Sequence, residues 1–410
     1  MQQAQAKSPT VTRILAGELC TGCGLCAALA PCAIRMEPQS PGYARPIQSG
    51  GVTPDAEHAI AESCPGAVIE PWADAPNVHP YWGPWRGVMT GAATDAQVRY
   101  EGSSGGAISA LLIHALESRL VDRVLHIAPD PNAPSRNVTS ISRTPAEILA
   151  RAGSRYSASS PMEFIEAALV EGGAMAFVGK PCDASALRRL ARLDPRVAQH
   201  VPLVLSFFCG GIPSHAGVDR IFDTMGVAPD EVLEFRYRGR GWPGTCAART
   251  KDRSVEMTYA ESWGGHLSKE VQFRCKICPD AVGGVADIAC ADAWYGGESG
   301  YPTFDEQEGR SLIVARSAAG ERLVAAAVAA GKLDVKPLAI GEIDKMQPSQ
   351  SRRKRVVLAR VAALVLAFQP RPQMSGLKVA AAFRRASARE AAQNLIGTLR
   401  RTLTGTRSRL

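Results

Sequence analysis

The chain contains 410 residues, of which 46% are hydrophobic and 21% charged, and this ordinary globular composition is enough for two or three packed units. No run reaches the ~18 apolar residues that a membrane span requires, since the longest candidate, residues 356–368, is short and carries Arg360. The net charge of +8 is unevenly distributed along the chain. Residues 351–410 contain 14 Lys and Arg and one acidic residue, a net charge of +13, whereas residues 1–350 contain 33 basic and 38 acidic residues, a net charge of −5.

The first motif in the chain is a set of cysteines near the N-terminus. Cys20, Cys23 and Cys26 have C-x2-C-x2-C spacing, and Cys64 directly precedes a proline. In a two-cluster ferredoxin, each half supplies a C-x2-C-x2-C-x3-C-P run, and the last cysteine of each run binds the cluster of the other half. Here the fourth position of the first run is Ala30, and the second half retains only its final cysteine. The four remaining thiolates therefore predict one 4Fe-4S cluster in a ferredoxin-like module.

Two alternatives remain open for these cysteines. Four thiolates in close pairs also suit a tetrahedral zinc ion, although successive C-x2-C steps beside small residues favour a cubane cluster. Cys32 is a spare thiol, which could replace Cys64 if the segment folds differently. A disulfide framework is disfavoured, because residues 1–15 contain no charged-then-apolar signal segment and we expect a reducing, cytoplasmic location.

Prolines at positions 71, 76, 80 and 84 follow this motif and indicate a linker. We therefore expect three parts: a ferredoxin-like α+β iron–sulfur domain at 1–80, an α/β domain at 81–345, and a basic helical tail at 346–410. In the second part, predicted strands and helices alternate with short loops, which favours a mainly parallel sheet covered by helices. The predicted strands are 121–128, 174–178, 201–208 and 312–315, and the predicted helices are 107–116, 184–193, 215–224 and 321–330.

Two glycine-rich segments of the second part could hold the phosphates of a cofactor. Residues 102–106 (Gly-Ser-Ser-Gly-Gly) precede a predicted helix, whose free N–H groups and dipole favour an anion. Residues 151–157 combine two arginines, hydroxyl groups and a tyrosine, which suit a phosphate and a ring. Each segment has a simpler interpretation, the first as a tight turn and helix cap and the second as a solvated surface loop. The arginines of residues 236–240 could likewise bind an anionic substrate or lie in solvent.

The remaining cysteines include a second set of four. Cys182 and Cys209 each follow a predicted strand, so both are expected at the carboxyl edge of the sheet, where open α/β folds gather ligands. Cys275 and Cys278 add a C-x2-C pair. Together these thiolates predict a second 4Fe-4S cluster, provided that three separate segments converge. The alternatives are a zinc site at the pair, or Cys182 as a nucleophile whose thiolate is favoured by a helix terminus and Lys180.

Taken in order, these motifs resemble those of the coenzyme F420 hydrogenase/dehydrogenase beta-subunit family. That family also includes 7-hydroxymethyl chlorophyll a reductase and a ferredoxin-dependent divinyl chlorophyllide reductase. The likeness extends over about residues 17–300 and rests on the segments 20–26, 104–106, 153–156, 179–182, 208–209, 241–244, 275–278, 286–288 and 291–294.

The resemblance implies that the α/β domain at 81–345 binds FAD as well as an iron–sulfur cluster. In this family, clusters and FAD exchange single electrons, and the flavin exchanges a hydride with a second substrate. The residues that the matching motifs would place at FAD are Ser104, Gly105, Gly106, Ser154, Arg155 and Tyr156, with Lys180 and Asp292 close to it. Two features depart from the family pattern: one ferredoxin cluster is missing, and the basic tail has no counterpart.

We therefore expect an FAD- and iron–sulfur-dependent oxidoreductase. Its electron donor would be ferredoxin or a redox partner subunit, and its small-molecule acceptor a deazaflavin or a tetrapyrrole-like compound. One alternative is a non-catalytic electron-transfer or assembly subunit of a larger redox complex. A less favoured alternative is a zinc-stapled regulatory protein whose tail binds nucleic acid. The motifs assign no catalytic residue.

The basic tail has two interpretations. Arginines at 384, 385, 400 and 401 alternate with apolar stretches, which predicts docking to an acidic partner or to an anionic lipid surface at the inner face of the membrane. Alternatively, the tail is a helix packed on the body with a solvated basic face. In both cases we expect helices, with Pro370 and Pro372 separating two pieces.

Overall fold

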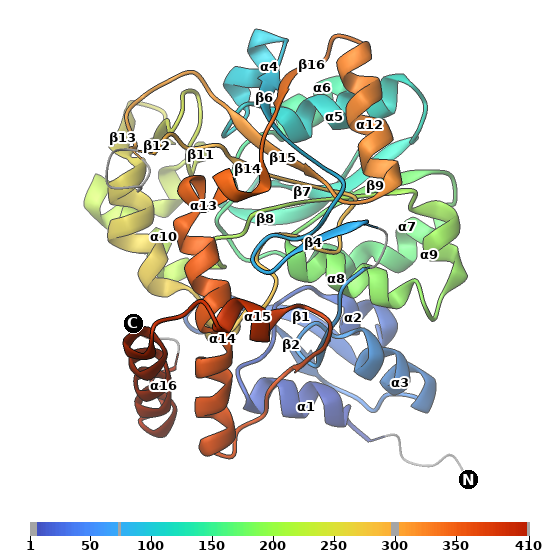
Figure 1. Ribbon diagram of the computed structural model, residues 1–410, viewed down its shortest axis with the longest axis vertical. Helices are drawn as coiled ribbons and strands as arrows, with labels where there is room; N and C mark the ends of the chain where they lie inside the picture. Colours follow the sequence, from blue (N-terminus) through green and yellow to red (C-terminus); the bar gives the residue numbers. More distant parts are fainter. Residues whose placement is uncertain (1–5, 73–74, 297–302, 408–410) are drawn as a thin grey trace.

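The computed structural model describes residues 6–72, 75–296 and 303–407. A central eight-stranded sheet with helices on both faces forms the body (Figure 1). A smaller N-terminal module and a group of C-terminal helices lie next to each other at the lower end of the body in this view. Within the described residues, we find no helix that combines the length and the hydrophobicity of a membrane span.

The N-terminal module consists of three helices and a small hairpin. Its elements are α1 (Pro9–Ala16), α2 (Leu25–Leu29), β1 (Ile34–Gln39), β2 (Tyr43–Gln48), α3 (Pro54–Ser63) and β3 (Val68–Ile69). β1 and β2 pair antiparallel. Two helices begin at a hydroxyl cap followed by proline: Ser8 accepts a hydrogen bond from the N–H of Val11, and Thr53 accepts one from the N–H of Ala56. The apolar faces of these elements enclose a small core of their own.

The central sheet has the strand order β16-β6-β15-β14-β10-β9-β7-β8. Its strands are β6 (Gly87–Ala93), β7 (Arg123–Asp130), β8 (Ala133–Ser142), β9 (Met175–Val178), β10 (Leu203–Phe207), β14 (Ile288–Asp292), β15 (Ser311–Ala315) and β16 (Leu333–Pro337). Neighbouring pairs among β7, β9, β10 and β14 are parallel, and the other pairs of this sheet are antiparallel. The expectation of a mainly parallel sheet is therefore wrong. β8 shows why, since only two residues separate it from β7, and a parallel connection needs a long crossover.

Helices cover both faces of this sheet. One face packs against α4 (Ala96–Glu101), α5 (Ala107–Glu117), α6 (Pro145–Ala150) and α12 (Ala318–Ala329), and the other against α7 (Ile165–Glu171), α8 (Pro181–Leu190) and α9 (Pro195–His200). Successive residues of a strand point to opposite faces, so Val204 belongs to one core and Leu205 to the other. The central strands are therefore buried on both sides, which leaves their carboxyl ends as the accessible edge.

Smaller elements surround the body. β4 (Asn77–His79) and β5 (Gly83–Trp85) form a hairpin in the predicted linker. An antiparallel sheet of β11 (Glu234–Arg236), β12 (Thr245–Arg249) and β13 (Ser254–Thr258) packs against α10 (His215–Met225). The connections contain η1 (Pro161–Phe164), η2 (Pro229–Glu231), η3 (Ala260–His266), η4 (Leu267–Glu270), α11 (Phe273–Lys276) and η5 (Ile340–Glu342).

The tail is helical and its inner side is packed on the body. It contains α14 (Pro348–Leu366), β17 (Gln373–Met374), α15 (Val379–Phe383) and α16 (Ala388–Leu403), and the short helix α13 (Ile343–Met346) leads into it. Val356, Val357 and Leu364 of α14 are fully buried, and β17 pairs in parallel with β3 of the N-terminal module. α14 ends four residues before Pro370, in agreement with the predicted break.

Candidate functional site

The first set of cysteines surrounds a small apolar cavity in the N-terminal module. Cys20 and Cys23 lie in the loop before α2, Cys26 lies in its first turn, and Cys64 is the C-cap of α3. All four line the cavity together with apolar side chains from α1 and α3. Gly22, at φ +78°, allows the loop to turn sharply, and its N–H donates to Cys20 Sγ over 3.4 Å. Hydrogen bonds to sulfur are among the contacts that set the potential of iron–sulfur clusters.

The surroundings of these thiols suit a cationic inorganic core. Burial raises the pKa of Cys64 to about 11, and the charge of Cys20 acts in the same direction. Burial also raises the pKa of Cys23 and of Cys26. Four thiolates around one apolar cavity repel one another, so they need metal cations between them to be ionised together. Cys32 is exposed and does not line the cavity, which favours Cys64 as the fourth ligand.

The second set brings together three segments that are far apart in the sequence. Cys182 lies in the first turn of α8 after β9, and Cys209 follows β10, as expected for the carboxyl edge of parallel strands. Cys275 lies in α11, and Cys278 is two residues beyond it. The N–H of Ile212, in the loop after Cys209, donates to Cys275 Sγ over 3.4 Å. Burial raises the pKa of Cys182, and the nearby charges of Cys209 and Cys275 also raise it, so all three segments converge.

Among residues 6–72, 75–296 and 303–407, no group of three or more His, Cys, Asp or Glu side chains is arranged to hold a single metal ion. A tetrahedral zinc ion requires its thiolates to converge at about 2.3 Å from one point. A 4Fe-4S cluster instead binds each of its four thiolates to a different iron atom, so the thiolates surround a larger core. Both sets of cysteines remain candidate cluster ligands on the basis of residue type and common location.

Helix α14 holds the loops of the second set. Arg353 donates hydrogen bonds to the carbonyl oxygens of Cys209, over 2.9 Å, and Gly210, over 2.6 Å. Lys354 is buried and donates to the carbonyl oxygen of Pro279, in the loop after the C-x2-C pair. The basic residues on the inner side of the tail therefore make structural contacts with the cysteine loops.

A pocket of about 260 Å³ lies beside the second set of cysteines, and Cys209 forms part of its wall. Both glycine-rich segments line it and meet directly, because the N–H of Ser154 donates to Ser103 Oγ. Seven of the eight residues expected at a flavin line this pocket: Ser104, Gly106, Ser154, Arg155, Tyr156, Lys180 and Asp292. The fold therefore unites segments that the sequence could only suggest separately.

The eighth residue, Gly105, is buried behind the pocket wall. A β-carbon at this position would lie 2.6 Å from the carbonyl oxygen of Gly91 and 2.7 Å from the backbone nitrogen of Ser311. A side chain would therefore displace β6 or β15, so glycine permits the close approach of these backbones. Gly106, at φ +72°, caps α5, and the first turn of this helix lines the pocket. The free N–H groups at the start of α5 thus suit a phosphate.

A buried ion pair lies in the wall of the pocket, next to Cys182 in the sequence. The Nζ atom of Lys180 lies 2.8 Å from Asp183 Oδ2 and donates to the carbonyl oxygen of Ser159. Burial opposes the charge of Lys180, but Asp183 and Cys182 outweigh it and raise the pKa of the ammonium group. Within the described part of the chain, Asp183 Oδ1 is buried without a hydrogen-bond partner although the residue lines the pocket. Such an orphaned oxygen is commonly satisfied by a bound ligand or water.

Two of the expected residues use their polar groups within the protein. Arg155 donates to Asn137 Oδ1 and to three backbone carbonyl oxygens. Asp292 accepts two bonds from Arg238, of 2.8 and 2.9 Å, and a third of 2.7 Å from Trp242 Nε1. Arg155 and Asp292 therefore hold the walls of the pocket, and the charge of Asp292 is already compensated by Arg238. Arg238 is buried, so the alternative that the arginines of residues 236–240 lie in solvent does not hold for this residue.

His126 lines the pocket and was not predicted as a site residue. It lies on β7, is 8% exposed, and shares a 2.8 Å hydrogen bond with Ser142 Oγ. Burial lowers its pKa to about 4, and the charge of Arg151 adds to this effect. The available signal was one polar side chain in an apolar predicted strand, which is more typical of a core position than of a site.

The neutral state of His126 makes the protein less stable in acid. In the unfolded chain its pKa is near 6.5, so below that pH the unfolded state gains a proton that the folded state does not bind until pH 4. The free energy of unfolding should therefore fall by about 2 kcal/mol between pH 7.5 and pH 5. His126→Gln should remove most of this loss, measured by urea unfolding at both pH values. The exposed His58→Gln serves as the control, and an unchanged acid loss in His126→Gln would contradict the assignment.

The fold and the site define the class of protein. Residues 88–166 match the family model described as Coenzyme F420 hydrogenase/dehydrogenase, beta subunit N-term, and residues 172–340 match its companion model, which describes the C terminus of the same beta subunit. The chain therefore belongs to this family of redox subunits, which confirms the resemblance. The matched ranges contain the pocket and the second set of cysteines, whereas the first set and the helical tail lie outside them.

Individual relatives agree with this assignment. The coenzyme F420 hydrogenase subunit beta of Methanococcus voltae is 27% identical over 300 residues, which is 70% of this chain and 99% of the relative. The F420-dependent formate dehydrogenase subunit beta of Methanocaldococcus jannaschii is 27% identical over 226 residues, 54% of this chain and 57% of the relative. The chloroplastic 7-hydroxymethyl chlorophyll a reductase of Oryza sativa subsp. japonica is 21% identical over 235 residues, 53% and 45% of the two chains.

A solved structure supports the fold. A chain of the F420-reducing NiFe hydrogenase complex from Methanosarcina barkeri superimposes with a TM-score of 0.51 and 21% identity, covering 70% of this chain and 96% of that chain. At this identity the likeness concerns the fold alone.

Proposed function

We propose that this chain is an iron–sulfur flavoprotein oxidoreductase. Single electrons would pass between a ferredoxin or a redox partner subunit and two 4Fe-4S clusters, and FAD in the pocket would reduce or oxidise an organic molecule such as a deazaflavin or a tetrapyrrole-like acceptor. The first cluster would be held by Cys20, Cys23, Cys26 and Cys64, and the second by Cys182, Cys209, Cys275 and Cys278. A bound flavin supplies the conversion between one-electron and two-electron transfer, which clusters alone do not perform.

The observation that carries this proposal is the position of Cys209. It belongs to the second set of cysteines and also forms part of the pocket wall. A cluster ligand in direct contact with a cofactor pocket offers a short route for electrons through buried protein. The Lys180–Asp183 pair lies beside the same route, since the charge of Cys182 acts on Lys180 and both members of the pair line the pocket.

The residues of the pocket have distinct roles in this proposal. The N-terminus of α5 would offset the negative charge of a dinucleotide phosphate or of a reduced ring, and Lys180, already paired with Asp183, would form part of the wall beside it. Ile108, Leu112 and Val178 would exclude water from the apolar part of the ligand. Arg155 and Asp292 would keep the walls in position, as their hydrogen bonds indicate.

A second candidate is a non-catalytic electron-transfer or assembly subunit. It is favoured by the fact that most of the relatives named above are subunits, and that the solved neighbour belongs to a hydrogenase complex. In this case a redox partner subunit would supply or complete the substrate site, and the chain alone would not turn over an organic acceptor.

Redox titration of the anaerobically purified chain distinguishes the two candidates. We expect bound FAD whose visible absorbance is bleached by dithionite and returns when a deazaflavin or a tetrapyrrole-like acceptor is added. Free FAD at equal concentration, with the same reductant, is the control for direct chemical reduction of the acceptor. Iron without FAD, or FAD that no acceptor reoxidises, would favour the second candidate and contradict the first.

A further inference from the structure

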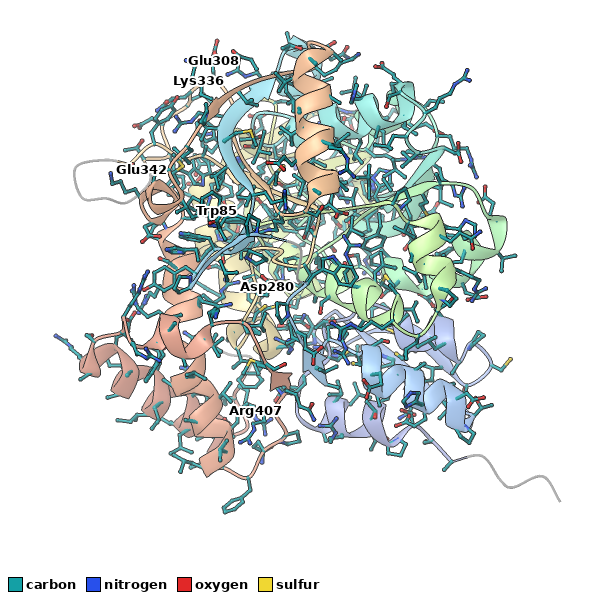
Figure 2. All side chains as sticks on the ribbon, turned by 45° about the vertical axis from the view of Figure 1, so that its right-hand side comes forward. Trp85, Asp280, Glu308, Lys336, Glu342 and Arg407 are labelled. Atoms are coloured by element: carbon teal, nitrogen blue, oxygen red, sulfur yellow. The ribbon has the colours of Figure 1, made fainter. Side chains whose placement is uncertain are left out.

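The tail lies outside the family match, and its two sides differ. Its inner side is anchored: α14 binds the cysteine loops, β17 extends β3, and Arg407 donates to the carbonyl oxygen of Gly17 over 3.3 Å. Figure 2 shows Arg407 between the tail helices and the N-terminal module. The tail is therefore a fixed part of the molecular surface, and its outer side has a defined shape and charge.

α14 and α16 lie side by side at this surface (Figure 1). Arg355 Nε donates to Glu390 Oε2 over 2.8 Å, and Arg360 Nε donates to Asn394 Oδ1 over 3.0 Å. Because both contacts advance along the two helices together, the helices run in the same direction.

The C-terminal ends of both helices form one end of the tail, since Arg407 donates to Gln369 Oε1 over 2.5 Å. We name the exposed apolar side chains here the apolar tip: Val365, Leu366, Phe368 and Leu403. Their exposed fractions are 44%, 59%, 96% and 72% respectively. A phenylalanine that is almost entirely in water is costly unless a partner covers it, so these side chains indicate a contact surface.

The outer face of α16 continues this surface. Arg389, Ile396, Arg400 and Leu403 are all exposed and follow one another at intervals of seven, four and three residues. Such spacing places them on a single face of a helix. The face therefore alternates cations with apolar side chains, a pattern typical of helices that lie in the interface of a membrane.

The exposed charged side chains of the tail are positive. The exposed cations of the tail are Arg352, Arg371, Lys378, Arg384, Arg385, Arg389 and Arg400, of which Arg385 also lies over the ring of Tyr81 on the body. Glu390 is the only acid of residues 351–410, and Arg355 and Arg352 already pair with it. The described part of the tail therefore presents no unpaired carboxylate to offset its positive charge.

We propose that the apolar tip and these cations dock the protein on an anionic phospholipid bilayer. The tip would enter the boundary between headgroups and acyl chains, and the arginines would contact lipid phosphates. A second copy of the chain would bring two positive surfaces together, and a nucleic acid would leave Phe368 and Leu403 in water. An anionic bilayer is the partner that satisfies both the charge and the apolar area.

Vesicle sedimentation of the full-length protein tests this proposal. We expect binding to vesicles of phosphatidylcholine with phosphatidylglycerol, little binding to phosphatidylcholine alone, and weaker binding as salt screens the charges. The double variant Leu366→Ser, Phe368→Ser should bind phosphatidylglycerol vesicles about tenfold less tightly or worse, because it loses most of the apolar contact. The matched control is Phe164→Ser, Val170→Ser, which removes side chains that are 50% and 72% exposed on the body and should bind as the wild type does.

Circular dichroism of each variant shows whether it has folded without reference to bound iron or flavin, so failure of the proposed function and failure of docking can be distinguished. Absence of sedimentation with phosphatidylglycerol vesicles, or equal binding by the tip variant, would overturn the proposal. A dimer that dissociates only in the tip variant would instead assign the tip to a second copy. Binding to soluble polyglutamate without binding to vesicles would assign the surface to an acidic protein.

Discussion

Replacing Cys23 with serine is expected to remove about four iron atoms from each chain, and replacing Cys275 is expected to remove a different four. Cys23 lines the apolar cavity of the N-terminal module, and Cys275 accepts N–H bonds from Ile212 and Gln272 in the body. Serine has nearly the size of cysteine, but its hydroxyl group is a harder ligand that does not replace a soft thiolate. Counting iron and acid-labile sulfide in anaerobically purified variants measures both effects.

The exposed Cys32 provides the matched control for these variants. It belongs to neither set, so Cys32→Ser should retain all of its iron. Circular dichroism and flavin content, measured on the same samples, separate loss of one cluster from loss of the fold. Equal iron loss in Cys32→Ser and Cys23→Ser would contradict the assignment of the first set, as would full iron retention in Cys23→Ser.

The second large effect is expected from Ser109→Trp. Ser109 lies in the first turn of α5 and lines the pocket. An indole ring at this position would occupy space that a flavin needs, whereas the cysteine loops are on other segments. We therefore expect the FAD content to fall from about one per chain to nearly none, with unchanged iron, which absorbance after acid release of the flavin measures.

A tryptophan at the other end of α5 is the control for any effect that an added indole ring has on the helix itself. Ser118 is the exposed C-cap of α5, so the indole of Ser118→Trp can extend into solvent. This variant should bind FAD as the wild type does. Normal FAD content in Ser109→Trp would show that flavin binds elsewhere and would refute the proposed pocket.

Local motifs were sufficient for the elements that depend on neighbouring residues. C-x2-C-x2-C spacing identified the loop before α2, and the positions of Cys182 and Cys209 after strands followed from α/β alternation. The glycine-rich segment at 102–106 was correctly placed at the start of a helix. In each case the chemistry is fixed by a few consecutive residues, which a single sequence displays directly.

Features that depend on contacts between distant parts of the chain could not be predicted from local motifs. The antiparallel edges of the sheet depend on which strands become neighbours, and strand pairing leaves little trace in composition. His126 became a pocket residue because β7 lies beside β9. Asp292 accepts hydrogen bonds from Arg238 and Trp242, which lie about fifty residues earlier in the chain. The motif around Asp292 therefore suggested a site but could not reveal these partners.

The same limit applied to the tail. Its composition indicated a basic helical segment but left open whether it packs on the body or docks elsewhere. The structure shows both an anchored side and a free side, because Arg353 and Lys354 face inward whereas Phe368 and Arg400 face outward. The pattern of charged and apolar residues therefore predicted that the tail is helical. Only the tertiary contacts show which arginines face the body and which face outward.

The most direct test of the account is to count iron, acid-labile sulfide and flavin per chain in the wild-type protein, isolated without oxygen. Two 4Fe-4S clusters and one pocket predict about eight iron atoms, about eight sulfides and one FAD, at four irons for each cubane. A colourless protein that contains zinc, with neither sulfide nor FAD, would contradict it.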